Sequence, residues 1–481
     1  MSVVGLVLLV LVAVLVPATG LPGFIVLMFA AVVGAMAGVM NGTIPASFLA
    51  ALPTRIVNLL ENDLLQALPL YVLVGGLINR LPIAEGIFQT ATRVLRGRAA
   101  PGVATLVLGG LLGPMNGSIG ASVIALSRTA APHLAASATP PAARHALIAA
   151  ASTLGIVVPP SLVLILLGDA MMAAHTVAVN ATHRSQQILN TQDVFRGALV
   201  PAGLFFAACV LVTLVTARRA SVPAQRASTG ARDALVALAA VAFVAGVLAG
   251  VATGRFYAVE GAAAGAAALF LVCTVTGRLR APALAALLRE TLVLTGTLFA
   301  LLVAATTFTL VFRSLGSDRL LEDWIVGAAL GPAALTGVVL GAIALAALAL
   351  DAFEIIFVLV PVLMPPLLMR VPDATWVAVL ALLALQASFM LPPVGYALLM
   401  IRGVLAERVP VRALVRSTVP FLAAQVAVLG AVLAFPVLVH LAEPGAGAAS
   451  PATIPDDEVS RRMQEMLAPP QTQQPGDAAT P

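Results

Sequence analysis

Apolar runs of about 20 residues recur along this chain, and they limit what it can fold into. A helix of that length crosses the ~30 Å hydrocarbon core of a bilayer. Hydrophobic residues make up 60% of the 481 residues and charged residues 10%, whereas an average soluble protein carries roughly 25% charged residues. The sequence excludes an ordinary soluble domain and predicts an all-α polytopic membrane protein with about 10–11 transmembrane helices.

The expected spans lie at 3–19, 21–40, 64–78, 146–167, 197–216, 235–253, 257–276, 291–311, 374–401 and 419–440. Two more apolar stretches, 106–134 and 333–368, are interrupted by Gly, Pro and polar residues. The run 3–16 has neither a basic segment before it nor an Ala-x-Ala cleavage site, so we expect a retained first helix and not a signal peptide. Residues 442–481, rich in Pro, Gly, Ala and Gln, are expected to form a disordered extracytoplasmic tail.

All 26 basic residues are arginines, and the net charge is +5. Most of them lie in short gaps between apolar runs, which is the pattern of membrane topology and not of a nucleic-acid surface. The Arg-rich loops within 93–98, 218–232, 278–289 and 402–416 can all be cytoplasmic at once. Both chain ends then lie outside. The lipid bilayer is the expected surrounding of the chain, and no nucleic-acid partner is expected.

With this topology, 106–134 is a re-entrant hairpin from the cytoplasmic face and 333–368 is a second hairpin from the opposite face. A shift of about 235 positions brings 21–40 onto 257–276 and Asn116 onto Asp351. Inverted-topology repeats with broken helices are typical of secondary transporters, because unwound backbone at the membrane midplane is tolerated only where it lines a site. The alternative is that Gly and Pro merely kink ordinary spans, which leaves the correspondence unexplained.

The predicted organisation follows these repeats. Two amphipathic segments at corresponding positions, 83–98 and 317–326, are expected to lie along opposite membrane interfaces and to brace a fixed scaffold. The predicted domains are a first transmembrane helix at 1–20, repeat 1 at 21–217 with a hairpin at about 101–136 and a broken helix at about 145–168, a linker and connecting helix at 218–256, repeat 2 at 257–441 with a hairpin at about 333–369 and a broken helix at about 374–401, and the tail at 442–481.

The first hairpin carries a polar interruption between residues 113 and 122. Asn116, Gly117, Ser118 and Ser122 lie there among small residues and a proline. Free carbonyls and hydroxyls can bind sodium, and exposed helix N-termini attract an anionic substrate. We therefore interpret this segment as part of a substrate and cation site. The alternative is close helix packing through small residues.

Two Pro-Pro pairs interrupt the apolar runs that follow the hairpins. Pro159 and Pro160 follow Ser152 and Thr153 and precede Ser161. A proline removes a backbone donor and frees the carbonyl one turn earlier, so the helix must break there. The corresponding residues of the second half are Gln386, Ser388, Pro392, Pro393 and Gly395.

Asp351 and Glu354 lie three residues apart in a long apolar stretch, so one side of a helix turn can present both carboxylates. Buried acids in a membrane usually line a pathway, bind a cation, carry protons or pair with Arg. We assign both to the second half-site, and the alternative is a hydrogen-bonded cap of the hairpin. Sodium is expected at backbone and side-chain oxygens near Asn116, Ser118 and Ser152 and near Asp351, Gln386 and Ser388.

The sequence has no metalloprotease, hydrolase or Walker motif. Cys209 and Cys273 lie inside apolar spans, where neither a disulfide nor a zinc site is supported. The chain is therefore not expected to be an enzyme, and no cofactor is predicted apart from sodium as the coupling ion. A membrane-embedded enzyme is the remote alternative.

Several motifs resemble the large membrane subunit (DctM-like) of tripartite ATP-independent periplasmic (TRAP) transporters, over 68–203 and 257–405. The resemblance rests on ALPLY at 67–71, ASTLG at 151–155 with PPS at 159–161, EGA at 260–262, Pro361 with Pro365, and PPVG at 392–395. A narrower resemblance, to the branch labelled mannitol/chloroaromatic compound transport, rests on LLGD at 166–169, LDAFEII at 350–356, LQASF at 385–389 and IRGV at 401–404.

The resemblance implies an elevator-type transporter of the bacterial inner membrane, in which hairpins and broken helices carry an organic anion, mostly a carboxylate, driven by a sodium gradient. It also implies two partners, a small four-helix membrane subunit and a periplasmic substrate-binding protein. Leu391 stands where the family usually has Thr, Ala384 where it has Asn, and Met115-Asn116 where small hydroxyl residues are common. Leucine offers no side-chain oxygen, so backbone carbonyls would have to complete the second cation site.

A second hypothesis in the same class is a self-sufficient sodium- or proton-coupled organic anion carrier. In that case Asp351 and Glu354 would move protons, and no binding protein would be needed. The sequence does not identify the solute.

Overall fold

The computed structural model describes residues 2–45, 50–61, 63–95, 97–116, 118–183, 189–217, 231–405 and 407–442. Every regular element in these ranges is helical. Gly117 of the predicted first half-site and residues 443–481 of the predicted tail lie outside them. The prediction of an all-α polytopic fold is confirmed.

The first half of the chain consists of α1 (Ser2–Thr19), α2 (Gly23–Met40), α4 (Leu52–Leu60), α5 (Asp63–Ile78), α6 (Ile83–Leu95), α7 (Ala100–Leu112), the short 3-10 helix η1 (Pro114–Asn116), α8 (Ile119–Ala136), α9 (Pro141–Val157), α10 (Leu162–Thr182) and α11 (Thr191–Ala217). The helix α12 (Ala231–Ala252) connects the halves. The second half consists of α13 (Ala258–Val275), α14 (Ala281–Ser314), α15 (Ser317–Gly327), α16 (Pro332–Ala346), α17 (Ala352–Glu354), the π-helical segment η2 (Ile355–Leu359), α18 (Val360–Arg370), α19 (Ala374–Phe389), α20 (Tyr396–Val404), α21 (Val411–Ala434) and α22 (Val437–His440).

Length separates two kinds of helix in the described part of the chain. Seven helices are long and apolar enough to cross a membrane, and α5 with α6, bent by 64° at a break, forms either a broken span or a re-entrant loop. The shorter apolar helices include α7 and α16, which are the first arms of the hairpins. They also include α9 and α19, which are the first halves of the broken helices. A span that is broken by unwound backbone is shared between two helices, as in secondary transporters.

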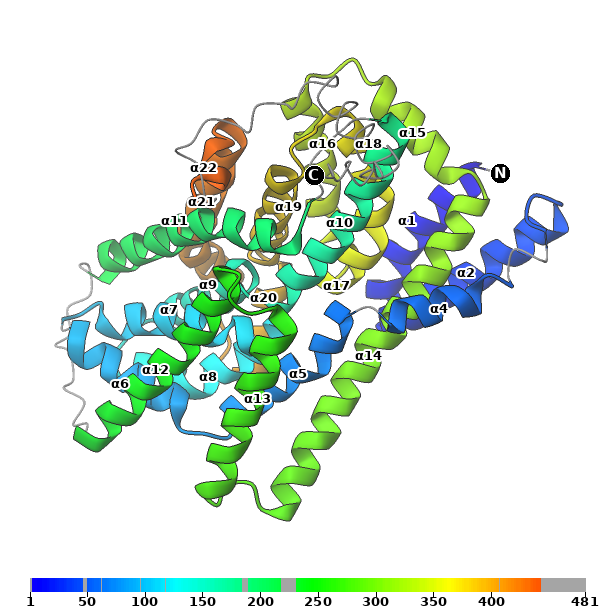
Figure 1. Cartoon of the computed structure of the whole chain (residues 1–481). Coiled ribbons are helices and arrows are strands. Elements are labelled where there is room, and N and C mark those ends of the chain that lie inside the picture. Colours follow the sequence, from blue (N-terminus) through cyan, green and yellow to red (C-terminus); the bar gives the residue numbers. More distant parts are fainter. Residues whose placement is uncertain are drawn as a thin grey trace, which may run out of the picture. The chain divides into compact units, whose positions relative to one another are not determined.

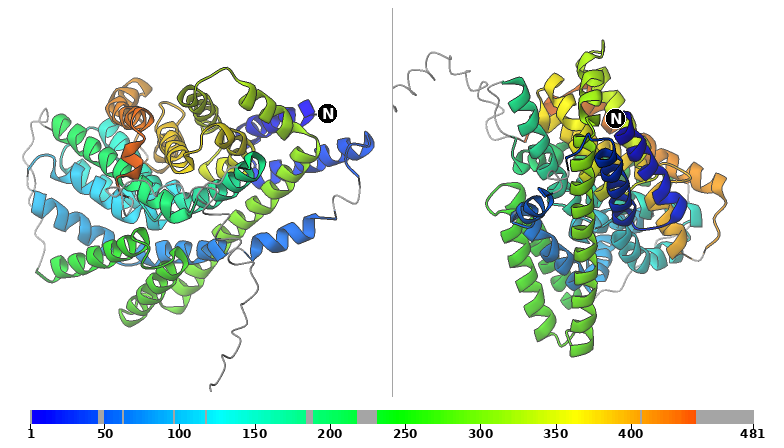
Figure 2. Two further views of the ribbon diagram at one scale, coloured as in Figure 1. Left: turned by 45° about the horizontal axis from the view of Figure 1, so that its top comes forward. Right: turned by 90° about the vertical axis from the view of Figure 1, so that its right-hand side faces the viewer.

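Helices of each half pack against helices of the other half. The helix α2 packs on α14 of the other half, and α13 packs on α5 (Figures 1 and 2). The second part of each broken helix packs in the same way on the opposite hairpin, α10 on α18 and α20 on α8. Reciprocal packing of this kind is what inverted-topology repeats produce.

Two helices begin earlier than the sequence pattern predicts. The expected start at 291 is wrong, because α14 begins at Ala281 and contains Arg289 and Glu290. The expected start at 419 is also wrong, because α21 begins at Val411 and contains Arg412. Charged residues in the first turns resemble a loop in a hydropathy pattern, but they do not stop a helix from forming.

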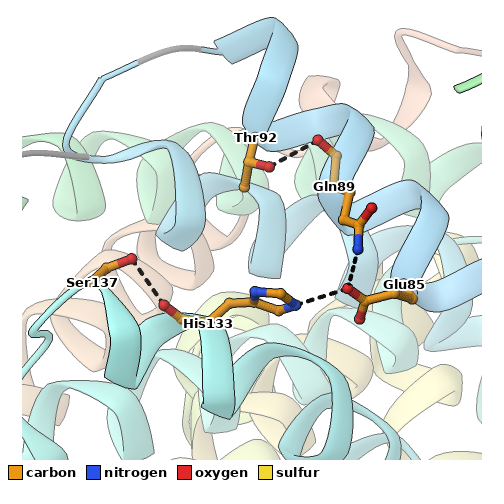
Figure 3. A network of polar contacts seen from close by, with 5 residues as sticks. All are labelled: Glu85, Gln89, Thr92, His133 and Ser137. Carbon is orange, nitrogen blue, oxygen red and sulfur yellow. Dashed lines mark hydrogen bonds and ion pairs between the residues drawn. The ribbon is translucent and has the colours of Figure 1, made fainter. Parts of the chain in front are cut away.

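Each amphipathic helix of the predicted pair is tied to the hairpin of its own half. His133 of α8 and Glu85 of α6 are joined through Nε2 and Oε1 at 2.9 Å (Figure 3). The His133 ring also stacks on Phe88, with ring centroids 4.7 Å apart. In the second half, the guanidinium of Arg370 in α18 donates to the carbonyls of Ala328 and Leu330 after α15, at 3.2 and 3.1 Å. The amphipathic helices α6 and α15 are thus attached to their hairpins at corresponding places in the two halves.

Candidate functional site

The tip of the first hairpin is built from short polar side chains. Ser118 caps α8, because its Oγ accepts a hydrogen bond from Ala121 N at 3.2 Å. Asn116 donates from Nδ2 to Ser122 Oγ at 3.3 Å and accepts at Oδ1 from Asn79 Nδ2 at 3.5 Å. Asn79 follows α5 in the sequence and was not predicted as a site residue. It ties the hairpin tip to the preceding span.

Two glycines bring the hairpin tip onto the first broken helix. A Cβ added to Gly113 would lie 2.7 Å from Gly155 Cα, which is too close for any larger residue. A small cavity of about 10 Å³ lies beside this contact, and that is about the room that one water molecule needs. Its lining includes Ser118, Ser122 and Ser152 together with Gly155. Three of the residues predicted to bind a cation or substrate therefore surround one cavity.

The first Pro-Pro pair removes two helical donors from the end of α9. Pro159 and Pro160 have no N–H group, so the carbonyls of Gly155 and Ile156 lose their intrahelical partners. Ser161 replaces one of these bonds, because its hydroxyl donates to Ile156 O at 2.7 Å. Ser161 also caps α10 by accepting from Leu164 N at 3.1 Å. Pro159 offers no such replacement to the Gly155 carbonyl, and Gly155 is one of the residues that line the cavity.

The donor set at this cavity fits a hard cation. Ser152 donates its hydroxyl hydrogen to Ala149 O at 2.8 Å, which leaves its oxygen lone pairs for a ligand. Ser118 and Ser122 also line the cavity, so its polar side chains are hydroxyls. Within the described residues, no cluster of three or more His, Cys, Asp or Glu could hold a metal ion. Hydroxyl oxygens are ligands that suit hard cations.

The acids of the second hairpin form a capping box. Asp351 Oδ1 accepts from Phe353 N at 2.9 Å and from Glu354 N at 3.0 Å, and Glu354 Oε2 accepts from Asp351 N at 3.1 Å. This is the capping role that the sequence left open as an alternative. The other oxygen of Glu354 lies against Gly23 at the start of α2, where a Cβ would overlap it. Asp351 Oδ2 accepts no hydrogen bond from the described residues, so it can still bind a ligand.

Gln386 connects the two broken helices. Its Nε2 donates to the backbone carbonyl of Thr153 at 3.2 Å, and its Oε1 accepts from Gln425 Nε2 at 2.8 Å. Gln386 and Gln425 are both fully buried. Ser388 donates to Ala384 O at 2.8 Å. The Gln386 amide therefore makes its hydrogen bonds inside the helix bundle. Among the described residues, Gln386 makes no hydrogen bond to Asp351.

Gln425 is a site-forming residue that the sequence analysis missed. It lies in α21 and donates to Leu383 O at 3.1 Å as well as to Gln386. Its own Oε1 is buried without a partner in the described structure. A lone amide in an apolar membrane helix was the available signal, because such residues face the bundle interior.

The two helix breaks differ in exposure. Pro159, Pro160 and Ser161 are buried. In the second half Leu391 is 38% exposed and Val394 is 44% exposed. The other residues of the second break are Pro392, which is half-buried, Pro393, which is exposed, and Gly395, which is buried. Both Pro-Pro peptide bonds are cis. The second helix break is thus more exposed than the first, whereas Glu354, Gln386 and Ser388 of the second half-site are buried.

A family model described as "Tripartite ATP-independent periplasmic transporter, DctM component" matches residues 7–438. Two curated relatives are named C4-dicarboxylate TRAP transporter large permease protein DctM. The protein of Rhodobacter capsulatus is 23% identical over 317 residues, which cover 64% of this chain and 70% of the relative. The protein of Pseudomonas aeruginosa is 25% identical over 325 residues, which cover 66% and 71%. The crystal structure of the Alcanivorax borkumensis YdaH transporter shares the fold, with a TM-score of 0.62 at 15% identity over 82% of this chain and 89% of that chain.

Proposed function

Because the chain belongs to the DctM component family of tripartite ATP-independent periplasmic transporters, we propose that it carries a C4-dicarboxylate across the membrane through its two half-sites. It is the large membrane subunit of such a transporter, a multi-pass protein of the bacterial inner membrane, and not an enzyme. The substrate class comes from the two curated relatives, whose names specify C4-dicarboxylates.

The cavity between the first hairpin and the first broken helix is the observation that carries the coupling proposal. Its lining includes Ser118, Ser122, Ser152 and Gly155, and its size suits one small ion. Unwound carbonyls and half-helix C-terminal ends coordinate sodium in other secondary transporters. We assign this cavity to a sodium ion that is bound together with the substrate.

The helix starts around the site suit the carboxylates of the substrate. The helices α8, α10 and α20 begin at the breaks, next to Ser118, Ser161 and Gly395. The N–H groups that the serine caps leave unpaired, together with the partial positive charge of a helix start, favour an anion. A dicarboxylate would be held between these helix starts while the hairpins and broken helices move past the scaffold. This elevator movement is part of the proposal.

Partners complete the proposed system. The family works in three parts by its description, so we expect a small four-helix membrane subunit and a periplasmic substrate-binding protein. The binding protein would capture the solute first and deliver it to this subunit. The narrower resemblance to the mannitol/chloroaromatic branch stays a prediction.

Uptake of labelled succinate into proteoliposomes tests the proposal. The vesicles would contain the chain with its membrane partner, and the binding protein would be added outside. We expect accumulation under an inward sodium gradient and none under a proton gradient alone. Accumulation that ignores sodium and follows the proton gradient would instead establish the proton-coupled hypothesis, in which Asp351 and Glu354 carry protons.

A further inference from the structure

Tyr396 occupies the accessible helix break of the second half and has no assigned role. It is the first residue of α20, directly after the Pro392-Pro393 pair and Gly395. Its side chain is half-buried, whereas the other tyrosine of the spanning core, Tyr71, is only 2% exposed. A ligand entering the second half-site would therefore meet Tyr396.

The Tyr396 ring is held in place and its hydroxyl is left open. The ring packs edge-on against Phe389 at a centroid distance of 6.1 Å, which anchors its apolar part. The hydroxyl makes no hydrogen bond to any part of the chain that the structure describes. A tyrosine that is mostly buried normally finds a partner for its O–H group. At this exposed helix break, a bound ligand can supply the partner for the Tyr396 hydroxyl.

The hydroxyl lies across from the first hairpin. A Cβ added to Gly120, in the first turn of α8, would lie 3.7 Å from Tyr396 Oη. The helix α20 packs along α8, so this neighbourhood is fixed by the fold. The hydroxyl thus lies between the starts of α8 and α20, where unpaired N–H groups also point.

The second hairpin carries the acids Asp351 and Glu354, which would repel a carboxylate. A carboxylate in this site therefore needs hydrogen-bond donors to hold it. A tyrosine hydroxyl is such a donor, and bonds from a donor to a charged group are the stronger kind.

We propose that the Tyr396 hydroxyl binds a carboxylate of the transported anion and is a specificity-determining residue of the second half-site. The proposal rests on the proposed dicarboxylate function. In this proposal the substrate contacts both repeats directly. The start of α8 provides the contact from the first repeat, and the side chain of Tyr396 provides the contact from the second.

Replacing Tyr396 by Phe removes only the hydroxyl and keeps the ring against Phe389. In proteoliposomes with saturating binding protein, we expect Tyr396→Phe to raise the KM for succinate by about tenfold or more, because a hydrogen bond to a charged group is lost. The sodium concentration that gives half-maximal uptake should not change. The control is Tyr257→Phe, which removes a hydroxyl at an exposed helix start and should leave both values unchanged.

Three outcomes are distinguishable. If the wild type takes up no C4-dicarboxylate, the proposed function fails. If the wild type takes up succinate and Tyr396→Phe has the same KM and the same sodium dependence, the Tyr396 proposal is overturned. A variant with altered sodium dependence and unchanged KM would overturn it as well, because the hydroxyl would then serve the cation. A melting temperature equal to that of the wild type shows that the variant is folded.

Discussion

The side-chain amide of Gln386 donates to the backbone carbonyl of Thr153 at 3.2 Å, and both residues stand six positions before a Pro-Pro pair. Equivalent positions of the two repeats therefore meet each other across the bundle. The contact places the two broken helices side by side, with α19 packed on α9. Gln425 holds the Gln386 amide from a third helix.

This contact predicts energetic coupling between Gln386 and Gln425. Gln386→Leu should destabilise the protein by about 1–3 kcal/mol, because it removes both hydrogen bonds of a fully buried amide, to Thr153 O and from Gln425 Nε2. The double variant with Gln425→Leu should cost less than the sum of the two single changes, by at least about 0.5 kcal/mol. Unfolding of the four proteins in detergent measures the coupling. Strict additivity would show that the two amides do not form a unit.

Neighbouring glycines in α7 give a matched pair of variants. A Cβ on Gly109 would overlap the Ala151 carbonyl of α9, whereas the nearest atoms to a Cβ on Gly110 are 4.0 Å away on Phe206. Gly109→Ala should cost about 1–3 kcal/mol through overpacking. Gly110→Ala should be neutral or stabilise by up to about 1 kcal/mol, because alanine favours a helix. Equal melting temperatures for the two variants would contradict the close packing of the first hairpin on α9.

Asp351 offers two variants that separate capping from transport. Asp351→Asn keeps the side-chain oxygen that accepts from Phe353 N and Glu354 N, so the fold should be unchanged. We expect it to abolish uptake, because the negative charge at the helix break is lost. Asp351→Ala removes the cap too and should cost about 1 kcal/mol of stability. Uptake at the wild-type rate by Asp351→Asn would leave Asp351 with a structural role alone.

Ser152 tests the assignment of the first cavity to sodium. Ser152→Ala removes one of the oxygens around the cavity, so the sodium concentration for half-maximal uptake should rise by about fivefold or more. Ser137→Ala is the control, because Ser137 donates to His133 O at the far end of α8 and does not line this cavity. A sodium dependence that is the same in both variants would remove Ser152 from the cation site.

Most of the fold could be predicted from local sequence, and much of the site could not. The Pro-Pro pairs and the apolar lengths act within one helix, so residues such as Pro159 and Pro392 already mark the breaks. Asn79, Gln425 and Tyr396 act through contacts between distant segments, which no local pattern contains. The role of Gln386 also depends on such contacts. Its polarity indicated a site, but the structure turns its amide towards Thr153.

The start of α14 is a part of the fold that the sequence pattern predicts wrongly. Arg289 and Glu290 reduce the apolar character of the chain there, so the pattern places a loop where the helix continues. Arg80 lies close to this turn and pairs with Glu290 at 3.2 Å. The pair joins the segment that follows α5 in the first half to α14 in the second, and only the folded chain reveals it.

Affinity purification of the tagged chain from native membranes in mild detergent, with mass spectrometry of what stays bound, tests the central claim most directly. The account predicts a small four-helix membrane protein in the complex and, after cross-linking, an exported soluble protein that binds a C4-dicarboxylate. Recovery of this chain alone, in a form that takes up the anion in proteoliposomes without any partner, would contradict it and establish a self-sufficient carrier.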